Sequence, residues 1–336
     1  MATWDALGHL PLEITRVESE TLVRETPRFT RKTTVLSLHG AGETGLGEDV
    51  AYDAAEHERF PRLPLEGRWT LASFSEHVGT LTLFDPAPGQ AAAVDYRRWC
   101  VESAALDLAL RQAGTTLARA LGRTIEPLTF ASSNADWEGW LALYPALRFK
   151  LDPTPDWPAE KFAALAAAGV VDVADLKGAY HGTGVDNPPD ADLYRRVVEA
   201  FPDAWLEDPA LTPDTLEVLE HQAGRITWDA PIHSWADVEA LPFPPRCLNC
   251  KPSRFGALPR LFEFYDRCAA HGIALYGGGQ FELGVGRLQI ELLAALFHPH
   301  GSNDVAPTDF NDPHPLPGLP TSPLMLVEEP GFRARL

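Results

Sequence analysis

The stretch AWLED, at residues 204–208, shows the pattern that decides the fold: a short apolar run that ends in charged side chains. Amphipathic stretches such as WPAEKFAALAAAG and DADLYRRVVEAFP separate it from similar runs along the chain. Eight strands that alternate with seven helices predict parallel βα units. The other runs are LTFASS (128–133), LRFKLD (147–152), VVDVADLKG (170–178), RITWDAP (225–231), RCLNCKPS (246–253), IALYGGG (273–279) and NDVAP (303–307).

Eight such units can close on themselves as a (β/α)₈ barrel, and residues 127–310 are just long enough to do so. The alternative is an open, doubly wound sheet. That fold would usually place a G-x-G-x-x-G sequence after its first strand, and this chain has none there. We therefore expect an α/β fold with a barrel over residues 127–310.

Residues 1–126 have a different texture, which predicts a separate α+β domain. Residues 12–40 alternate in the manner of strands, and helical spacing follows at 68–78 and, strongly, at 100–121. The glycine-rich sequence HGAGETGLGEDV (39–50) is expected to form a loop, although it lacks the G-K-[ST] ending of a phosphate loop. The proline-rich tail, 311–336, is expected to be extended and to pack back on this first domain.

The composition excludes several classes of function. A net charge of −19 argues against a surface for nucleic acid or anionic membrane, either of which needs a basic patch. The chain has no apolar run of transmembrane length and no signal-peptide pattern at its start, so we expect a cytoplasmic protein. Cys247 and Cys250 form a C-x-x-C sequence without a second ligand pair, and are expected to be packing residues rather than a zinc or redox site. We expect a homo-oligomer, because symmetric assemblies are common among soluble enzymes.

Carboxylates end three successive runs: Asp175, Glu207 and Asp229. A barrel binds its ligands at the carboxyl ends of its strands, so these side chains should converge. One aspartate after a strand is more often a helix cap or a turn residue, but three on successive strands are harder to explain in that way. Three carboxylates without histidine or cysteine predict a Mg²⁺ site. The chain has five lysines, and Lys150, Lys177 and Lys251 also lie at these strand ends.

Five motifs spread over the chain carry a family resemblance: GLGED (45–49), ESAALDLALRQAG (102–114), WLEDP (205–209), TWDAPI (227–232) and NCKPSRFGAL (249–258). Together they resemble the enolase superfamily, in particular its muconate-lactonizing branch, which includes muconate cycloisomerases, o-succinylbenzoate synthases and dipeptide epimerases. The resemblance implies a modified (β/α)₇β TIM barrel with an N-terminal capping domain. It also implies that Asp175, Glu207 and Asp229 bind Mg²⁺, which would hold the carboxylate of a small acid and stabilise an enediolate. Lys251 would be the principal base and Lys150 would stabilise the oxyanion.

Two positions depart from the pattern of that branch. Its usual K-x-K is Lys150-Leu151-Asp152 here, and its usual D-x-N is Asp175-Leu176-Lys177. By strand alternation both changed side chains should point into the barrel, so we expect an ion pair between Asp152 and Lys177. Lys177 could instead replace the missing lysine as an acid/base.

The departures favour a one-base reaction, either β-elimination (dehydration) or cycloisomerisation, with Lys251 as the base. A second possibility is a racemase or epimerase of an N-acyl amino acid or dipeptide, which would use Lys177 or Lys150 on the opposite face. A third is a barrel that binds metal and ligand but has lost catalysis. Asp152 and Glu282 are candidate substrate contacts, with a structural role equally open for Glu282.

Overall fold

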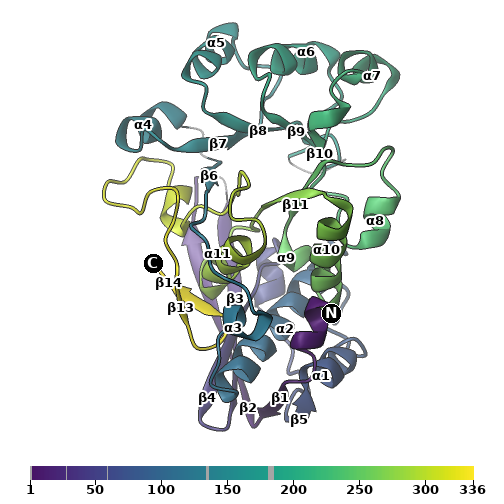
Figure 1. Ribbon diagram of the computed structural model, residues 1–336, viewed down its shortest axis with the longest axis vertical. Helices are drawn as coiled ribbons and strands as arrows, with labels where there is room; N and C mark the ends of the chain where they lie inside the picture. The colour runs from purple at the N-terminus through teal and green to yellow at the C-terminus, as the bar shows by residue number, and fades with distance from the viewer. Residues whose placement is uncertain (1, 28, 59, 134–135, 181–184) are drawn as a thin grey trace.

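The computed structural model describes residues 2–27, 29–58, 60–133, 136–180 and 185–336, which form two parts placed end to end in Figure 1. The first part has an antiparallel sheet in the order β2 (Arg16–Glu25), β3 (Thr30–Gly40) and β4 (Glu43–Asp49). Helix α2 (Ala93–Gln112) packs against this sheet, and residues 99–110 of the helix are all buried. The remaining elements of this part are η1 (Thr3–Ala6), β1 (Pro11–Ile14), which pairs with β5 (Gly67–Thr70), η2 (Ala54–His57), α1 (Leu71–Val78) and α3 (Leu117–Leu121).

The expectation of a loop at residues 39–50 is wrong, because most of this segment is strand β4. Two of its glycines permit a very close approach to α2. A Cβ at Gly45 would lie 2.2 Å from the Ala104 carbonyl oxygen, and one at Gly47 would lie 2.1 Å from that of Cys100. The glycines therefore serve packing between strand and helix rather than loop flexibility.

Parallel strands form the second part, as the apolar runs predict. One sheet has the order β10-β9-β8-β7-β6, and a second parallel pair joins two further strands. The strands are β6 (Ala131–Ser132), β7 (Arg148–Leu151), β8 (Val171–Asp175), β9 (Trp205–Glu207), β10 (Ile226–Thr227), β11 (Cys247–Cys250) and β12 (Ala274–Gly277).

Contacts between these two groups of strands complete the ring. The Asn249 N–H donates to the Trp228 carbonyl at 3.0 Å, which joins β11 to the chain just after β10. Parallel bridges pair Gly278 with Asp304 and Phe130 with Asn303, so residues 303–304 connect the end of β12 to the start of β6. This eighth segment is the run NDVAP, and the predicted modified barrel is confirmed.

Helices connect successive strands, and those after β7, β8 and β9 lie outside the barrel at the upper end of Figure 1. No described helix is long and apolar enough to span a bilayer. The helices are α4 (Trp137–Leu143), α5 (Ala159–Ala168), α6 (Ala191–Ala200), α7 (Pro213–Leu219), η3 (Ala223–Arg225), α8 (Trp235–Glu239), α9 (Pro252–Phe255), α10 (Leu258–His271), α11 (Val285–Phe297) and η4 (Thr308–Asn311).

The final residues lie against the first part of the chain. Strands β13 (Val327–Glu329) and β14 (Arg333–Arg335) form a hairpin, and Asp107 on α2 holds it. The Asp107 carboxylate accepts hydrogen bonds from the backbone N–H of Phe332, at 2.9 Å, and from the Arg333 side chain, at 2.8 Å. Asp107 is itself buried, so these hydrogen bonds both satisfy its carboxylate and dock the tail on α2.

All four cysteines are buried and free, which agrees with a packing role for Cys247 and Cys250. Both lie on β11. The thiol of Cys247 packs with Val173 and Tyr276, whereas Cys250 belongs to the main hydrophobic core. Burial raises the pKa of both thiols to about 12, so neither is a reactive thiolate at neutral pH.

Candidate active site

A cavity of about 290 Å³ lies at the carboxyl ends of the barrel strands, where the sequence predicts the site. It brings together Lys150, Lys177 and Lys251, the three predicted lysines, with Asp152. The other lining residues come from both parts of the chain: Tyr52, Ser132, Ser133, Gly279, Phe281, Arg287, Asp304, Ala306 and Asn311.

Lys150, on β7, points into the barrel and pairs with carboxylates from two neighbouring strands. Its Nζ contacts Glu207 Oε1 and lies 3.1 Å from Asp175 Oδ2. Burial alone would lower the pKa of this lysine, but the attraction of Glu207 and Asp175 outweighs it and raises the pKa well above its usual value. Lys150 is therefore a fixed positive charge, suited to stabilise an anion rather than to take a proton.

The Lys177 side chain lines the cavity, as expected, but Lys177 lies two residues beyond the end of β8, so strand alternation does not place it there. Its backbone is left-handed, with a φ of 54°. From this turn the side chain folds back, and Nζ contacts Asp175 Oδ2 and lies 3.5 Å from Asp152 Oδ1. Burial opposes the charged form, but Asp175 and Asp152 raise the pKa of Lys177 well above its usual range.

Glu207, at the end of β9, lies at the centre of the acidic group. Its Oε2 accepts hydrogen bonds from the Tyr276 hydroxyl and from Asn249 Nδ2, the latter at 3.2 Å. Burial raises the pKa of Glu207 well above normal; Lys150 opposes this shift, and the charges of Asp175 and Asp229 add to it. Asp175 differs, because Lys177 and Lys150 overcome its burial and hold its pKa below the usual range.

Lys251 directly follows β11. It faces Asp229, which lies two residues beyond the end of the preceding strand, β10. Its Nζ lies 2.9 Å from Asp229 Oδ2, and a second cation, Arg254, lies 3.1 Å from Asp229 Oδ1. The Tyr180 hydroxyl also donates to Asp229 Oδ2, at 2.9 Å. Burial favours the neutral acid, but Arg254 and Lys251 hold the pKa of Asp229 below its usual range.

Gly278 lets Lys251 reach the cavity. A Cβ at this position would lie 2.7 Å from Lys251 Cε and 2.7 Å from Asn249 Oδ1. Real Cβ atoms do not come so close to other heavy atoms, so a larger residue would displace the lysine. The middle glycine of the GGG sequence at 277–279 thus makes room for the Lys251 side chain.

The acidic residues suit a divalent cation. Among the described residues, one group of three potential ligands has its oxygens within 4.8 Å of one another: Asp175, Glu207 and Asp208. Asp208 takes the place in this group that the sequence assigns to Asp229. Both oxygens of Asp208 already accept backbone hydrogen bonds at 2.8 Å, from the N–H groups of Asp229 and Ala230.

Asp229 is engaged differently from Asp208, mainly by the cations Lys251 and Arg254 rather than by backbone N–H groups. Its Oδ1 is buried and accepts no hydrogen bond, although Arg254 is nearby. Asp175, Glu207, Asp208 and Asp229 are all fully buried, so four carboxylates lie close together at this end of the barrel. A hard oxygen-ligand set of this kind fits Mg²⁺.

The two candidate substrate contacts are placed differently. Asp152 lines the cavity, whereas Glu282 is not among the lining residues. Glu282 lies 3.0 Å from Arg287 through Oε2, and its Oε1 accepts a hydrogen bond from the Gln280 N–H at 2.6 Å. It is Arg287, on α11, that faces the cavity.

Sequence reasoning did not single out Arg287, Asp304, Arg254 or Tyr180. Asp304 is the second residue of the eighth run, NDVAP. The search for charged residues within or beside the predicted strands, which found Asp175, could have found it too. Arg287 lies within a helix and Tyr180 in a loop, where neither periodicity nor strand position marks them.

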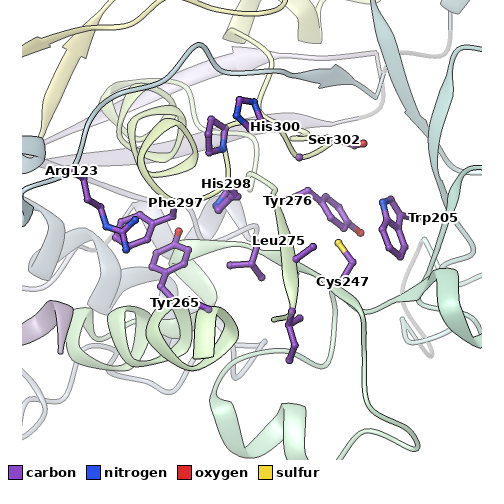
Figure 2. A pocket seen from close by; sticks show the side chains of 15 residues that line it. Arg123, Trp205, Cys247, Tyr265, Leu275, Tyr276, Phe297, His298, His300 and Ser302 are labelled. Carbon is purple, nitrogen blue, oxygen red and sulfur yellow. The ribbon is translucent and has the colours of Figure 1, made fainter. Parts of the chain in front are cut away.

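A larger cavity, of about 500 Å³, lies where β9, β11 and β12 begin, at their amino-terminal ends; Figure 2 shows the side chains that line it. Its walls include Trp205, Cys247 and Tyr276, near the starts or inner faces of strands, together with Tyr265 and Phe297, whose rings stack. None of the predicted catalytic or metal-binding side chains lines it, so it is not the candidate active site. Tyr276 lies between the two ends, since its ring lines this cavity while its hydroxyl binds Glu207.

Comparison with protein families matches both parts of the chain to one family. The model described as "Domain of unknown function (DUF8230) N-terminal domain" matches residues 5–120, and the one described as the C-terminal domain of DUF8230 matches residues 126–312. Among curated proteins, the o-succinylbenzoate synthase of Bacillus subtilis (strain 168) is 25% identical over 211 residues. That match covers 58% of this chain and 55% of the relative, so the chain spans about half the length of that relative.

Solved structures of the enolase superfamily share the fold. The muconate lactonizing enzyme of Pseudomonas putida aligns with a TM-score of 0.71 and 16% identity, over 96% of this chain and 97% of that one. A dipeptide epimerase from Methylococcus capsulatus, complexed with a Mg ion, aligns with a TM-score of 0.65 and 20% identity, over 87% and 89%. These matches confirm the fold that the resemblance to the enolase superfamily implies.

Proposed function

This chain belongs to the DUF8230 family and has the fold of the enolase superfamily, and from that basis we propose that it is a Mg²⁺-dependent enzyme that removes the α-proton of a small carboxylic acid. The observation that carries the proposal is the convergence of three lysines and a group of buried carboxylates on one cavity at the carboxyl ends of the strands. Neighbours of the same fold include a muconate cycloisomerase, a lactonizing enzyme and a dipeptide epimerase.

Asp175, Glu207 and Asp229 are the residues that would hold Mg²⁺, with Asp208 orienting the turn that carries Asp229. When bound, Mg²⁺ would lower the cost of the second negative charge that develops on a carboxylate as its α-proton leaves. Lys150 and Lys177 then contribute fixed positive charges at the walls of the cavity.

Lys251 is the proposed base. It extends past Gly278 into the cavity, where an α-proton would be within reach. Two carboxylates hold each of the other lysines as an ammonium group, which makes both of them poor bases. This difference favours a one-base reaction, either β-elimination or cycloisomerisation. Racemisation or epimerisation would need a second base on the opposite face, and Lys177 and Lys150 are the residues in position to supply it.

Proton exchange in D₂O tests the proposal. The protein, with and without Mg²⁺, is incubated with a panel that includes o-succinylbenzoate, N-acyl amino acids, dipeptides and 2-hydroxy acids. We expect at least one acid to lose its α-proton signal in the NMR spectrum, and chelation by EDTA to stop the loss. Tight, Mg²⁺-dependent binding of an acid without exchange of any in a broad panel would instead support a barrel that has lost catalysis. The cytoplasmic location and the homo-oligomeric state stay predictions from the sequence.

A further inference from the structure

Arg31, on β3, joins the first part of the chain to the barrel next to the proposed substrate cavity. Its side chain is fully buried, with 0% exposure. The guanidinium donates to the carbonyls of Val50 at 2.9 Å and Ala51 at 2.5 Å, and to those of Gln280 at 2.8 Å and Phe281 at 3.1 Å. The first two carbonyls precede Tyr52, and the second two belong to the loop after β12.

These hydrogen bonds hold residues that line the cavity. Tyr52 and Phe281 are both in its wall, and the guanidinium of Arg31 lies 4.8 Å from the centre of the Tyr52 ring. Arg31 itself is not among the lining residues. It therefore acts behind the wall, on the backbone segments that carry the two aromatic rings.

The backbone at Phe281 is strained, and Arg31 is placed to hold it so. Phe281 has a φ of 58°, in the left-handed region that a residue with a Cβ disfavours. Arg31 binds the carbonyl of Phe281 and that of the residue before it, so both peptide groups are fixed in this turn. Glu282 adds a local contact by accepting the Gln280 N–H. Strain of this kind persists where the surroundings determine the conformation, commonly at binding sites.

We propose that Arg31 is a positioning residue: it locks the loops at 50–52 and 279–282 together, holds Phe281 in its left-handed conformation, and so shapes the wall against which the substrate packs. The effect on substrate rests on the proposed function. The lock, meaning the hydrogen bonds by which Arg31 joins the two loops, does not depend on it. Because the four acceptors are carbonyls spread over two segments, the planar, five-donor guanidinium fits them and the ammonium of lysine does not.

A stability comparison tests the lock without any substrate. Phe281→Gly and Phe281→Ala both remove the ring, but alanine keeps the cost of a positive φ. In the protein with Arg31 intact, we expect the unfolding equilibrium constant of the Phe281→Gly variant to be about tenfold lower than that of the Phe281→Ala variant, because glycine carries no cost at a positive φ. In an Arg31→Lys background this difference should vanish, because the freed loop relaxes. An equal difference in both backgrounds would overturn the proposal.

If Arg31→Lys does not fold, hydrogen exchange of the unaltered protein decides instead. Under mild denaturant, amides in residues 50–52 and 280–283 should become exposed together and before global unfolding. Independent opening of the two segments would count against the lock.

A ligand measurement separates positioning from general stability. Arg225→Lys is the matched control, since Arg225 also donates to backbone carbonyls, those of Phe201 and Ala204 at 2.8 Å, but contacts no cavity residue. For an acid that exchanges, we expect Arg31→Lys to raise KM by about tenfold or more and Arg225→Lys to leave it unchanged. Mg²⁺ affinity by calorimetry should match that of the unaltered protein in both.

An unchanged KM in Arg31→Lys would reject the positioning role. Failure of the unaltered protein to bind Mg²⁺ or exchange any acid would reject the proposed function, and the glycine–alanine comparison would still decide on the lock.

Discussion

Lys177 Nζ lies 3.5 Å from Asp152 Oδ1 while it also contacts Asp175 Oδ2, so one lysine bridges a cavity residue and a candidate metal ligand. The ion pair between Lys177 and Asp152 that the two departures predicted is present. It forms by a different route from the one expected, because Lys177 approaches from a left-handed turn after β8 rather than from the strand.

Lys251 and Lys177 should differ sharply in their effect on proton exchange. Lys251→Ala removes the proposed base and should lower the exchange rate by about a thousandfold, whereas Lys177→Met should keep the rate within about tenfold. Lys161→Met is the control, because Lys161 packs on Trp157 away from the cavity. NMR in D₂O gives all three rates. Loss of exchange in Lys177→Met at unchanged Mg²⁺ affinity would support the two-base racemase instead.

Calorimetry with Mg²⁺ should separate ligands from the residue that orients them. Asp175→Asn, Glu207→Gln and Asp229→Asn each remove a negatively charged ligand, so we expect no measurable binding in any of them. Asp208→Asn should weaken binding by only about tenfold, because Asp208 acts through the backbone of Asp229. The reverse order for Asp208 and Asp229 would assign Asp208 as the third ligand.

Gly278→Ala should damage catalysis more than folding. The added Cβ would lie 2.7 Å from Lys251 Cε, so the lysine must move, and we expect exchange to fall by about a hundredfold. Gly89→Ala is a fair control, since a Cβ there meets nothing within 4 Å. Circular dichroism and Mg²⁺ affinity establish that the fold and the metal site persist. If Gly278→Ala exchanged protons as fast as the unaltered protein, Lys251 would not be the base, or its side chain would not need the position that it has here.

Glu291, inside α11, should make stability depend on pH. Burial raises the pKa of this residue to about 8, against an ordinary value of 4.5, and neither carboxylate oxygen has a hydrogen-bond partner among the described residues. The folded state therefore binds a proton that the unfolded state releases. This contribution is complete below pH 4.5 and is lost as the pH rises towards 8, at up to about 1.4 kcal/mol per pH unit.

Glu291→Gln should flatten that dependence, because the amide is neutral at every pH. Urea unfolding of both proteins at pH 5, 6.5 and 8 measures the difference, and other titrating groups cancel in it. The free energy of unfolding of the variant minus that of the original protein should increase as the pH rises. Parallel curves would show that Glu291 is ionised in the folded protein.

Much of the barrel could be predicted because apolar runs and strand ends are local features of the sequence. Asp175 and Glu207 end their strands, and Lys251 directly follows its own, so the rule for parallel barrels brings them together. The lysine at 150 and the aspartate at 229 follow from the same rule.

What could not be predicted depends on contacts between distant segments. Gly45 and Gly47 belong to a strand because α2 presses against it, and nothing near them in sequence reports that helix. Arg287 enters the cavity from a helix, and Glu282 is withdrawn from it by pairing with Arg287. The hydrogen bonds of Arg31 join residues about 250 positions apart, beyond any local pattern.

The side chain of Asn303 ties several segments together where the barrel closes. Its Oδ1 accepts from the Gly277 N–H at 2.6 Å and contacts His298 Nδ1 at 2.7 Å, while its Nδ2 donates to the carbonyls of Thr129, His298 and Gly301. Between β7 and β8 the joint is instead a ladder of backbone pairs, which tolerates many side chains. Many backbone pairs thus share the load between most strands, whereas one amide group serves several segments at this joint. Changing Asn303 to aspartate would replace that single donor by an acceptor and remove its hydrogen bonds to three carbonyls at once.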